Sequence, residues 1–339
     1  MRIVLDAMGS DDHPEPELQA AVEASRRWKE TLLLAGPEDL LQPRLDEQGI
    51  SQEQVRVVHA PDVLKMTDKP ARAARGKAKS SMAVGIQMIK DGEADAFVTA
   101  GNTGGALVNG LFILGRIRGV KRPALAVIFP VQGGHAITLD IGANADCKPE
   151  YLVQFAAMGS IYAETVLDKP SPRVGLLSNG EEPGKGNSLV KETYPLLEAA
   201  GLNFIGNVEP KEVAGGEVDV VVMDGFTGNV FIKTSEAVAS LMTKMIRDEI
   251  MSAPITKIGG MLVRPAFRRV GKVLDPAETG AAPLLGIDGL VFVGHGRSDA
   301  RAIVNGIRVT RQAVERDLLK ALRGAIQTRL ANPKQTGAS

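Results

Sequence analysis

The sequence predicts an α/β fold in layers around a largely parallel sheet, and three observations lead to this class. Apolar runs of strand length alternate with segments of helical periodicity over most of the 339 residues. Six of these runs are followed at once by a short loop rich in Gly, Asn and Asp. The chain is also longer than one simple core requires, so we expect a large domain or two lobes.

Each element follows from a local pattern. Buried apolar runs predict strands, and a Pro in the first turn or a Ser before it predicts where several helices begin. The expected strands are Ile3–Leu5, Thr31–Ala35, Val55–His59, Ala96–Ala100, Leu125–Phe129, Ala136–Leu139, Val174–Leu177, Phe204–Ile205, Val218–Met223 and Leu290–Val293. The expected helices are Pro14–Arg27, Pro37–Glu47, Met82–Lys90, Thr103–Leu114, Pro149–Val166, Ser188–Ala200, Thr227–Ile250 and Asp299–Leu330. We expect residues 1–330 to form one domain and residues 331–339 a polar tail.

Composition and charge exclude several classes of protein. Lys plus Arg and Asp plus Glu both number 40, so the net charge favours no nucleic-acid partner. The single cysteine, Cys147, cannot form an internal disulfide and has no His nearby in sequence to activate it as a nucleophile. The first apolar run is too short for a signal peptide, and no run approaches the ~20 residues that span a bilayer. We therefore expect a cytoplasmic protein.

The common catalytic motifs are absent from the sequence. No G-x-G-x-x-G follows a strand, and the segment from Gly180 to Lys185 has one spacer residue too few for a P-loop. The four His are scattered and no C-x-x-C or H-E-x-x-H occurs, so no metal site is expected. A G-x-S-x-G elbow is also missing. These absences disfavour dinucleotide, P-loop, zinc and serine-hydrolase chemistry.

The six Gly-rich loops predict one composite binding site. Ligands of an open α/β sheet bind at the carboxyl ends of the strands, where backbone N–H groups at helix N-termini hold anions. We therefore expect an anionic ligand that carries phosphate. The loops cover residues 6–10, 100–105, 140–144, 178–182, 224–229 and 294–299.

The ordered motifs resemble those of the bacterial phosphate acyltransferases, the PlsX family. The matching segments are Ser80-Ser81-Met82, residues 95–104, residues 140–144, Gly180-Glu181-Glu182 with Lys185-Gly186-Asn187, and residues 224–229. The resemblance extends from residue 1 to about residue 323. The chain departs from the family pattern at Ser10, Pro183-Gly184 and Arg297.

The resemblance implies both a fold and an activity. The family is related in fold to phosphotransacetylases and isocitrate dehydrogenase-type enzymes, with the site in a cleft between two lobes. Its members transfer a fatty acyl group from acyl-(acyl carrier protein) to inorganic phosphate, and the acyl phosphate enters phosphatidic acid and phospholipid synthesis. They need no cofactor. A homodimer, and a membrane glycerol-3-phosphate acyltransferase as the next enzyme, are implied as well.

Three alternatives to this activity differ from it in substrate or in role. One is a phosphotransacetylase-like enzyme that uses acyl-coenzyme A. Another is a non-catalytic scaffold at the membrane surface that binds acyl carrier protein or acyl phosphate. A decarboxylating dehydrogenase of related fold would need NAD and a divalent metal, and the sequence lacks the acidic cluster for that metal.

The chemistry of acyl transfer to phosphate suggests roles for four residues. Phosphate dianion is already a nucleophile, and a thiolate with a pKa near ~8.5 leaves readily, so the main demands are positioning and stabilisation of the oxyanion. We expect Lys185 to be the fixed cation, Asn187 and Asn229 to be neutral donors, and Asp224 to orient Lys185 or Asn229. Capping of a local turn is the alternative role for each Asn, and turn formation for Asp224.

The remaining candidates are polar residues in the same loops. We expect them to bind phosphate or substrate, with Arg297 and Ser298 at the start of the last helix. Helix capping is the alternative for Ser81, Asn102 and Thr103. A structural role is the alternative for His295, and support of the residues that touch the ligand is the alternative for Asn144. They are Ser81, Asn102, Thr103, Asn144, His295, Arg297 and Ser298.

Two basic segments complete the predictions. Residues 71–79 contain four cations and form either a solvated helix face or a dock for the acidic carrier protein. Residues 251–274 contain five basic residues, no acidic residue, and apolar residues near helical spacing.

We expect residues 251–274 to form two short helical pieces, because Gly259, Gly260 and Pro265 interrupt them. The segment is expected to bind the inner face of the membrane reversibly, and a dimer interface or a carrier-protein patch is the alternative. The residues expected at the membrane surface are Ile258, Leu262, Arg264 and Arg268.

Overall fold

The computed structural model describes residues 1–329, and their strands form two sheets. The larger sheet has the order β3-β2-β1-β4-β12-β11-β5, and the smaller has the order β6-β7-β10-β8-β9. Neighbouring strands are parallel except where β11 or β6 takes part. The strands are β1 Ile3–Asp6, β2 Leu32–Gly36, β3 Val55–His59, β4 Ala96–Thr99, β5 Ala124–Leu125, β6 Val127–Val131, β7 Gly134–Leu139, β8 Val174–Leu177, β9 Phe204–Val208, β10 Val220–Val222, β11 Ala281–Leu285 and β12 Leu290–Gly294.

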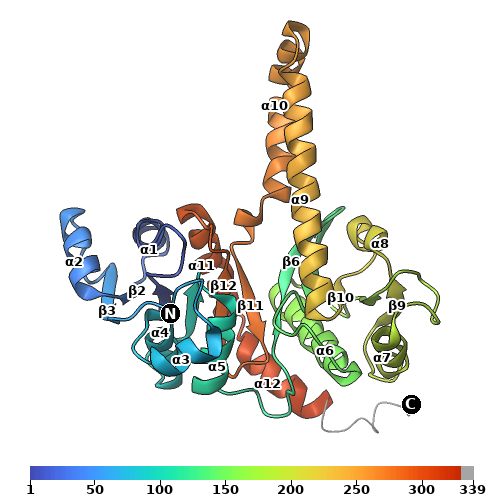
Figure 1. Ribbon diagram of the computed structural model, residues 1–339, viewed down its shortest axis with the longest axis horizontal. Helices are drawn as coiled ribbons and strands as arrows, with labels where there is room; N and C mark the ends of the chain where they lie inside the picture. Colours follow the sequence, from blue (N-terminus) through green and yellow to red (C-terminus); the bar gives the residue numbers. More distant parts are fainter. Residues whose placement is uncertain (330–339) are drawn as a thin grey trace.

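Helices cover the sheets, so each sheet is the centre of one lobe, and the layered α/β prediction is confirmed (Figure 1). The helices are α1 Glu15–Trp28, α2 Glu38–Glu47, α3 Pro70–Gly76, α4 Ser81–Lys90, α5 Thr103–Ile113, α6 Pro149–Val166, α7 Ser188–Glu198, α8 Pro210–Gly215, α9 Gly225–Ile250, α10 Pro254–Leu274, α11 Ala300–Glu315 and α12 Leu318–Arg329, with a 3₁₀ turn, η1, at Pro276–Glu278.

Alternation along the strands explains how the large sheet is covered on both faces. Val4 of β1 and Phe97 of β4 pack in one buried cluster with Met82 of α4. Their neighbours along the strands belong to a second cluster that includes Leu5 of β1 and residues of α1, α6 and α11. This second cluster also contains buried residues of the small sheet, so the two lobes share one continuous core.

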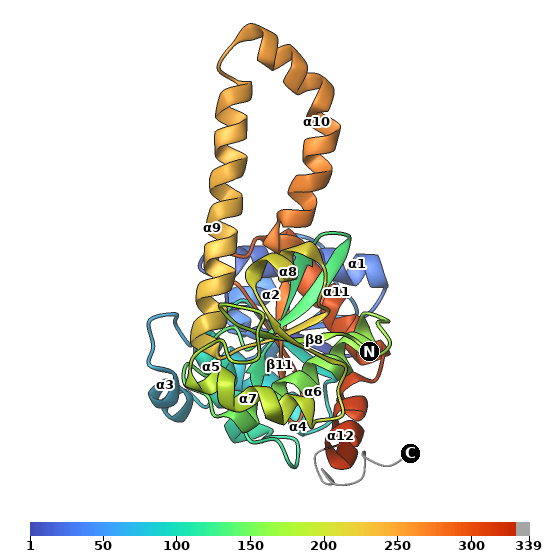
Figure 2. The same cartoon turned by 90° about the vertical axis from the view of Figure 1, so that its right-hand side faces the viewer.

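The two long helices α9 and α10 form a hairpin that projects from the body (Figures 1 and 2). The chain passes from β5 of the large sheet to β6 of the small sheet, and it returns through this hairpin to β11. No residue of α10 is buried, and the side chains of Ile255 and Leu262 are each 80% exposed. The hairpin is therefore both a projection and the return connection between the lobes.

The prediction of two helical pieces in residues 251–274 is wrong. The structure has one helix, α10, with Pro265 inside it, and Figure 2 shows this helix bending rather than breaking. Pro265 removes a single intrahelical hydrogen bond, and the exposed carbonyl that loses its donor can bind water instead. Within residues 1–329, no helix has the length and apolar character needed to cross a bilayer.

The other differences between the predicted and the observed helices and strands have local causes. Strand β11 was not predicted, since its run contains Pro283 and two Ala, which weaken a strand pattern. The expected strand Leu125–Phe129 divides between β5 and β6, which belong to different sheets. The last helix divides into α11 and α12 at Asp317, which has a left-handed φ of 52°. Its expected last residue, Leu330, and the expected tail at 331–339 lie outside the described residues.

Candidate active site

Three of the predicted loops meet at one edge of the large sheet. They follow β1, β4 and β12, which are adjacent and parallel, so their carboxyl ends lie side by side. The backbone N–H of Asp11 donates to the carbonyl of Gly296 at 2.8 Å and joins the first loop to the last. A Cβ added at Gly101 would lie 3.3 Å from Cα of Gly9, so the first and second loops pack backbone to backbone.

Asp6 supports these loops from beneath. Its buried carboxylate accepts hydrogen bonds from Oγ1 of Thr99 at 2.7 Å and from the N–H of Met8 at 3.1 Å, and the Ser81 hydroxyl bonds to it as well. Burial raises the pKa of Asp6 despite these donors. The expected capping role of Ser81 is wrong, because the hydroxyl oxygen of Ser80 caps α4 by accepting from the N–H of Ala83 at 3.3 Å.

Asn102 uses both ends of its amide within the protein. Its Oδ1 caps α5 by accepting from the N–H of Gly105 at 2.9 Å, and its Nδ2 donates to the carbonyl of Met66 at 3.0 Å. Thr103 is the first residue of α5 and is half-buried. The first N–H groups of a helix have no intrahelical partner, so the start of α5 offers backbone donors to an anion.

Asp140 joins the two lobes at the end of β7. Its Oδ1 accepts from the N–H of Leu125 in the large sheet at 3.0 Å and from the N–H groups of Gly142 and Ala143. Its Oδ2 accepts from the N–H and the Nδ2 of Asn144 at 2.7 and 2.9 Å. Burial raises the pKa of Asp140. Sequence reasoning did not single out this residue, although an Asp after a buried strand and before Gly and Asn is typical of such a turn.

Two loops of the small sheet pack against each other around Asn144 and Asn229. The carbonyl of Asn144 accepts from the N–H of Gly225 at 2.8 Å, and Nδ2 of Asn229 donates to the carbonyl of Ile141 at 3.3 Å. A Cβ at Gly228 would lie 1.9 Å from the Asp140 carbonyl oxygen, so this position admits no side chain. The contact fixes the start of α9 on the Asp140 loop.

Asp224 caps α9. One carboxylate oxygen accepts from the N–H of Thr227 at 2.9 Å and the other from its hydroxyl at 2.7 Å. We expected Asp224 to orient Lys185 or Asn229, but within residues 1–329 its carboxylate forms no hydrogen bond with either residue. Both of its oxygens accept the capping hydrogen bonds from Thr227.

Lys185 lies on a third loop of the small sheet. Asn187 caps α7 by accepting from the N–H of Val190 at 3.0 Å, and Asn179 accepts from the N–H of Gly186 at 2.9 Å, so both sides of the loop are held. The Lys185 side chain is exposed. Across the described chain its ammonium group makes neither an ion pair nor a hydrogen bond. An unpaired cation on a braced loop is suited to holding an anion.

His295 and Arg297 are exposed in the loop after β12, whereas Ser298 is buried. The N-cap of α11 is Asp299, whose carboxylate accepts from the N–H of Ala302 at 2.8 Å. Arg297 and Ser298 therefore precede the cap, and our placement of them at the start of the helix is slightly off. Like Lys185, the Arg297 guanidinium has no ion pair among residues 1–329.

A carboxylate cluster and a cysteine resemble reactive sites, but the charges around them disfavour both a metal ion and a nucleophile. The carboxylates of Glu181, Glu209 and Glu212 lie close enough to share a metal ion, yet the Lys211 ammonium lies within 2.9, 3.0 and 3.2 Å of them and neutralises the cluster. Burial, with nearby carboxylates, raises the pKa of the Cys147 thiol to about 12. Cys147 is therefore a neutral thiol at ordinary pH and a poor nucleophile.

The predicted residues thus fall into three groups. Ser81, Asn102, Thr103, His295, Arg297 and Ser298 lie at the edge of the large sheet; Asn144, Asp224 and Asn229 lie in the interlocked loops of the small sheet; Lys185 and Asn187 lie in its third loop. Asp140 connects the small sheet to the edge strand β5 of the large sheet through Leu125. No hydrogen bond or ion pair in the described residues links Lys185 to the others.

Solved structures with a similar fold include phosphotransacetylases. The EutD phosphotransacetylase from Staphylococcus aureus matches with a TM-score of 0.61 and 16% identity, covering 93% of this chain and 94% of that one. A phosphotransacetylase from Streptococcus pyogenes matches with the same values. At this identity the likeness defines the fold class, a two-lobed α/β fold of the phosphotransacetylase type.

Sequence relatives narrow the class to one family. The family model described as "Fatty acid synthesis protein" matches residues 1–321. A phosphate acyltransferase from Elusimicrobium minutum is 47% identical over 316 residues, 93% of each chain. Another from Pelotomaculum thermopropionicum is 44% identical over 328 residues, 97% of this chain and 96% of that one. The chain belongs to the phosphate acyltransferase family, and it is an acyltransferase.

Proposed function

We propose that the protein transfers a fatty acyl group from acyl-(acyl carrier protein) to inorganic phosphate. Its membership of the phosphate acyltransferase family supports phosphate as the acceptor. The observation that carries the proposal is the pair of exposed cations, Lys185 and Arg297, in loops at strand ends with no ion pair in residues 1–329. Anions fit such a site, because binding them displaces no internal partner.

The reaction needs little general acid or general base catalysis. A phosphate oxygen attacks the thioester carbon, a C–O bond forms, and the carbonyl electrons move to the oxygen. The tetrahedral intermediate collapses, the C–S bond breaks, and the carrier-protein thiolate takes a proton from water. Lys185 would stabilise the phosphate or the oxyanion, and the start of α5 at Thr103 would supply N–H donors. The neutral thiol of Cys147 has no part in this route.

We also propose that the basic segment at residues 71–79 docks the acidic carrier protein. Arg72 and Lys79 are exposed. Lys77 is less free than the sequence suggested, because its ammonium group binds the Asp68 carboxylate at 2.6 Å and the Val63 carbonyl at 2.8 Å. The dock therefore depends on its other cations, and salt should weaken docking.

The hairpin supports the proposal that the protein acts at the inner face of the membrane. Ile258 and Leu262 are 58% and 80% exposed on a helix without acidic residues. Apolar side chains of this kind insert shallowly while the cations attract anionic lipid. The lipid-like acyl phosphate would be released where a membrane glycerol-3-phosphate acyltransferase can consume it. Exposed apolar residues of α9, such as Leu241 and Met245, offer a face for the proposed homodimer.

The deciding experiment measures free carrier protein released from palmitoyl-carrier protein, with and without phosphate, together with trapped acyl phosphate. We expect release that requires phosphate, needs no nucleotide or NAD, and persists after exhaustive EDTA treatment. Faster turnover of palmitoyl-coenzyme A would identify the phosphotransacetylase-like alternative. Binding of the acyl-carrier protein without any turnover would identify a scaffold.

A further inference from the structure

The segment between β3 and α3, residues 60–69, crosses the loops that form the site at the large sheet. Nδ2 of Asn102 donates to the carbonyl of Met66 at 3.0 Å, so the segment is bonded to the residue that caps α5. A Cβ added at Gly296 would lie 2.5 Å from Cε of Met66, so the Met66 side chain packs on the loop after β12. Met66 therefore touches two of the three site loops, one with its backbone and the other with its side chain.

Hydrogen bonds within the segment hold Met66 in place. The Asp68 carboxylate accepts from the N–H of Lys65 at 2.8 Å and from the Lys77 ammonium at 2.6 Å. Lys77 also donates to the carbonyl of Val63 at 2.8 Å. These bonds close residues 63–77 into a loop and fix the backbone on both sides of Met66. Ordering such a loop costs conformational entropy, and ordered loops beside a ligand site commonly carry function.

The Met66 side chain presents an apolar surface among polar groups of the site. It is 40% exposed, and His295 and Arg297, on either side of Gly296, are exposed as well. An apolar side chain thus lies in the loops that also carry a cation proposed to hold phosphate. Methionine is flexible and polarisable, so it adapts to an apolar partner. An acyl donor has the same two parts, because its reacting carbonyl is polar and the carbons that follow are apolar.

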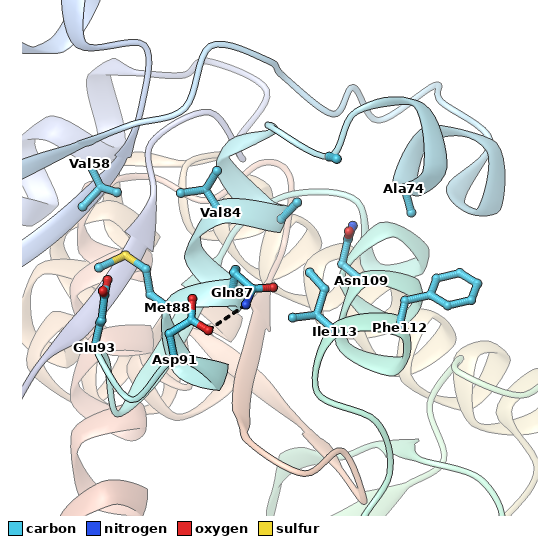
Figure 3. Close-up of a pocket in the computed structure, with 12 residues that line it drawn as sticks. Val58, Ala74, Val84, Gln87, Met88, Asp91, Glu93, Asn109, Phe112 and Ile113 are labelled. Atoms are coloured by element: carbon cyan, nitrogen blue, oxygen red, sulfur yellow. Dashed lines mark hydrogen bonds between the residues drawn. The ribbon is translucent and has the colours of Figure 1, made fainter.

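A groove between α4 and α5, with a volume of about 570 Å³ and a largely apolar lining, lies apart from this site (Figure 3). None of the predicted site residues lines it. At the first turn of α5, a Cβ added at Gly105 would lie 2.9 Å from Cδ2 of Leu64 and 3.4 Å from Sδ of Met82. These side chains separate the groove from the start of α5. Apolar contact for a donor bound at the start of α5 therefore comes from the side on which Met66 is exposed.

We propose that Met66 is a specificity-determining residue for acyl transfer: its side chain contacts the carbons that follow the thioester carbonyl, and Asn102 positions it. This inference rests on the proposed function. Each methylene that such a contact removes from water strengthens binding up to about fourfold. Because one side chain reaches only the first few carbons, Met66 distinguishes acetyl from longer acyl groups but does not distinguish butyryl from palmitoyl.

Two substitutions at position 66 test the contact. Met66→Gln keeps the length of the side chain and makes it polar, whereas Met66→Leu keeps it apolar. With acetyl, butyryl and palmitoyl carrier protein as donors, we expect Met66→Gln to lower kcat/KM about tenfold for the butyryl and palmitoyl donors and to leave the acetyl donor within about twofold. Met66→Leu should stay within about twofold of the parent protein with every donor. The KM for phosphate should not change in either variant.

Asn102→Ser tests the positioning role. Serine keeps an oxygen that caps α5 and removes the amide that holds the Met66 carbonyl. We expect a loss with the same pattern across the donors, largest for butyryl and palmitoyl. In the Met66→Gln background, Asn102→Ser should add little, because both substitutions remove the same contact. Additive losses that are equal for all donors would contradict this role for Asn102.

Two further measurements serve as controls. Met242→Gln makes the matched change at a methionine of α9 that is 52% exposed, and it should keep the donor profile of the parent protein. Inhibition by acetyl phosphate and butyryl phosphate compares short and longer acyl groups without turnover of a short donor. Met66→Gln should weaken inhibition by butyryl phosphate and leave inhibition by acetyl phosphate unchanged.

The outcomes separate the Met66 contact from the proposed function. If the parent protein turned over no acyl-carrier protein of any length, the function itself would be wrong. If it turned over the donors and Met66→Gln left their profile unchanged, or lowered kcat/KM equally for all of them, the contact alone would be wrong. A rise in the KM for phosphate would mean that Met66 only supports the loops. A loss that grew from butyryl to palmitoyl would contradict the position next to the thioester.

Discussion

Apolar side chains are buried in the body of the protein and exposed on the helical hairpin. In the body, Val4, Leu5 and Phe97 are fully buried between sheet and helices. In α10 no residue is buried, and Ile255 and Leu262 are 80% exposed. Packing therefore specifies the body, whereas the apolar side chains of α10 remain exposed in the structure. From this comparison we predict that the body carries out the chemistry and that the hairpin binds the membrane, and substitutions can test both parts of this prediction.

The largest effect is expected at the hairpin. Replacing both Ile258 and Leu262 by Glu removes two side chains that would enter the bilayer, each worth about 2 kcal/mol, so partitioning onto vesicles should fall about 1000-fold. Flotation with vesicles containing anionic lipid measures this loss. Leu196→Glu with Ile205→Glu makes the matched change on exposed apolar residues of the body and should leave flotation intact. Binding that survives the hairpin change would place the anchor elsewhere, while turnover of soluble donor should continue in both variants.

At Lys185 we expect the opposite result, a loss of activity with membrane binding retained. Lys185→Ala should lower kcat/KM about 100-fold, near 3 kcal/mol, because it removes charge that acts in the transition state. Flotation and the free energy of unfolding should not change, since the ammonium group has no partner in residues 1–329. Lys191→Ala, an exposed lysine of α7, is the matched control for activity. Normal kinetics for Lys185→Ala would move the essential cation to Arg297.

A smaller effect tests what holds the body together. The Asp219 carboxylate binds the Lys169 ammonium at 2.8 Å and the Arg173 side chain at 2.9 Å. Burial opposes its ionisation, yet these two cations hold the pKa of Asp219 well below its usual range. Asp219→Asn should lower the free energy of unfolding by about 2 kcal/mol at pH 7.

The pH dependence of this loss has a definite sign. A carboxylate whose pKa is lowered by folding contributes stability above its unfolded pKa, near ~3.9, and loses it as the pH falls toward the folded value. The difference between the parent protein and Asp219→Asn should therefore be constant above about pH 5 and shrink in acid. Urea unfolding at pH 7 and pH 3 measures it, with Glu192→Gln, an exposed carboxylate of the same lobe, as the control. A difference that grew in acid would contradict the assignment.

The smallest effect is expected at Cys147. Cys147→Ser should change kcat/KM less than twofold, because a thiol with a pKa of about 12 contributes almost no thiolate near pH 7.5. Labelling with iodoacetamide should be correspondingly slow. Loss of activity in the serine variant would mean that a thiolate takes part after all.

Local patterns predicted most of the body. The strands β1, β2, β4 and β12 are short apolar runs in the sequence because both faces of this part of the parallel sheet are covered. The division into two sheets could not be predicted from the sequence, because Leu125 and Val127 lie two residues apart in one apolar run and pair with different strands. Pairing partners depend on contacts far along the chain, which a local pattern does not contain.

The candidate site, like the fold, could be predicted from the sequence only in part. Sequence identified the loops, because Gly, Asn and Asp after a strand indicate a turn wherever they occur. It did not distinguish residues that hold the loops from residues free to bind a ligand. The polar atoms of Asn102 and Asp224 are occupied by helix caps and, at Nδ2 of Asn102, by the Met66 carbonyl, whereas Lys185 is unpaired in the described chain. Asp140 was missed because its importance comes from Leu125, fifteen residues earlier and in the other sheet.

The hairpin is also the segment through which the chain returns from one lobe to the other. Helix α9 begins on the Asp140 loop of the small sheet, and α10 leads through η1 into β11 of the large sheet. At that end Arg301 of α11 forms ion pairs with Asp275 and Glu278. A contact at the tip of the hairpin would therefore act on both lobes at once, because each helix of the hairpin is joined to a different lobe.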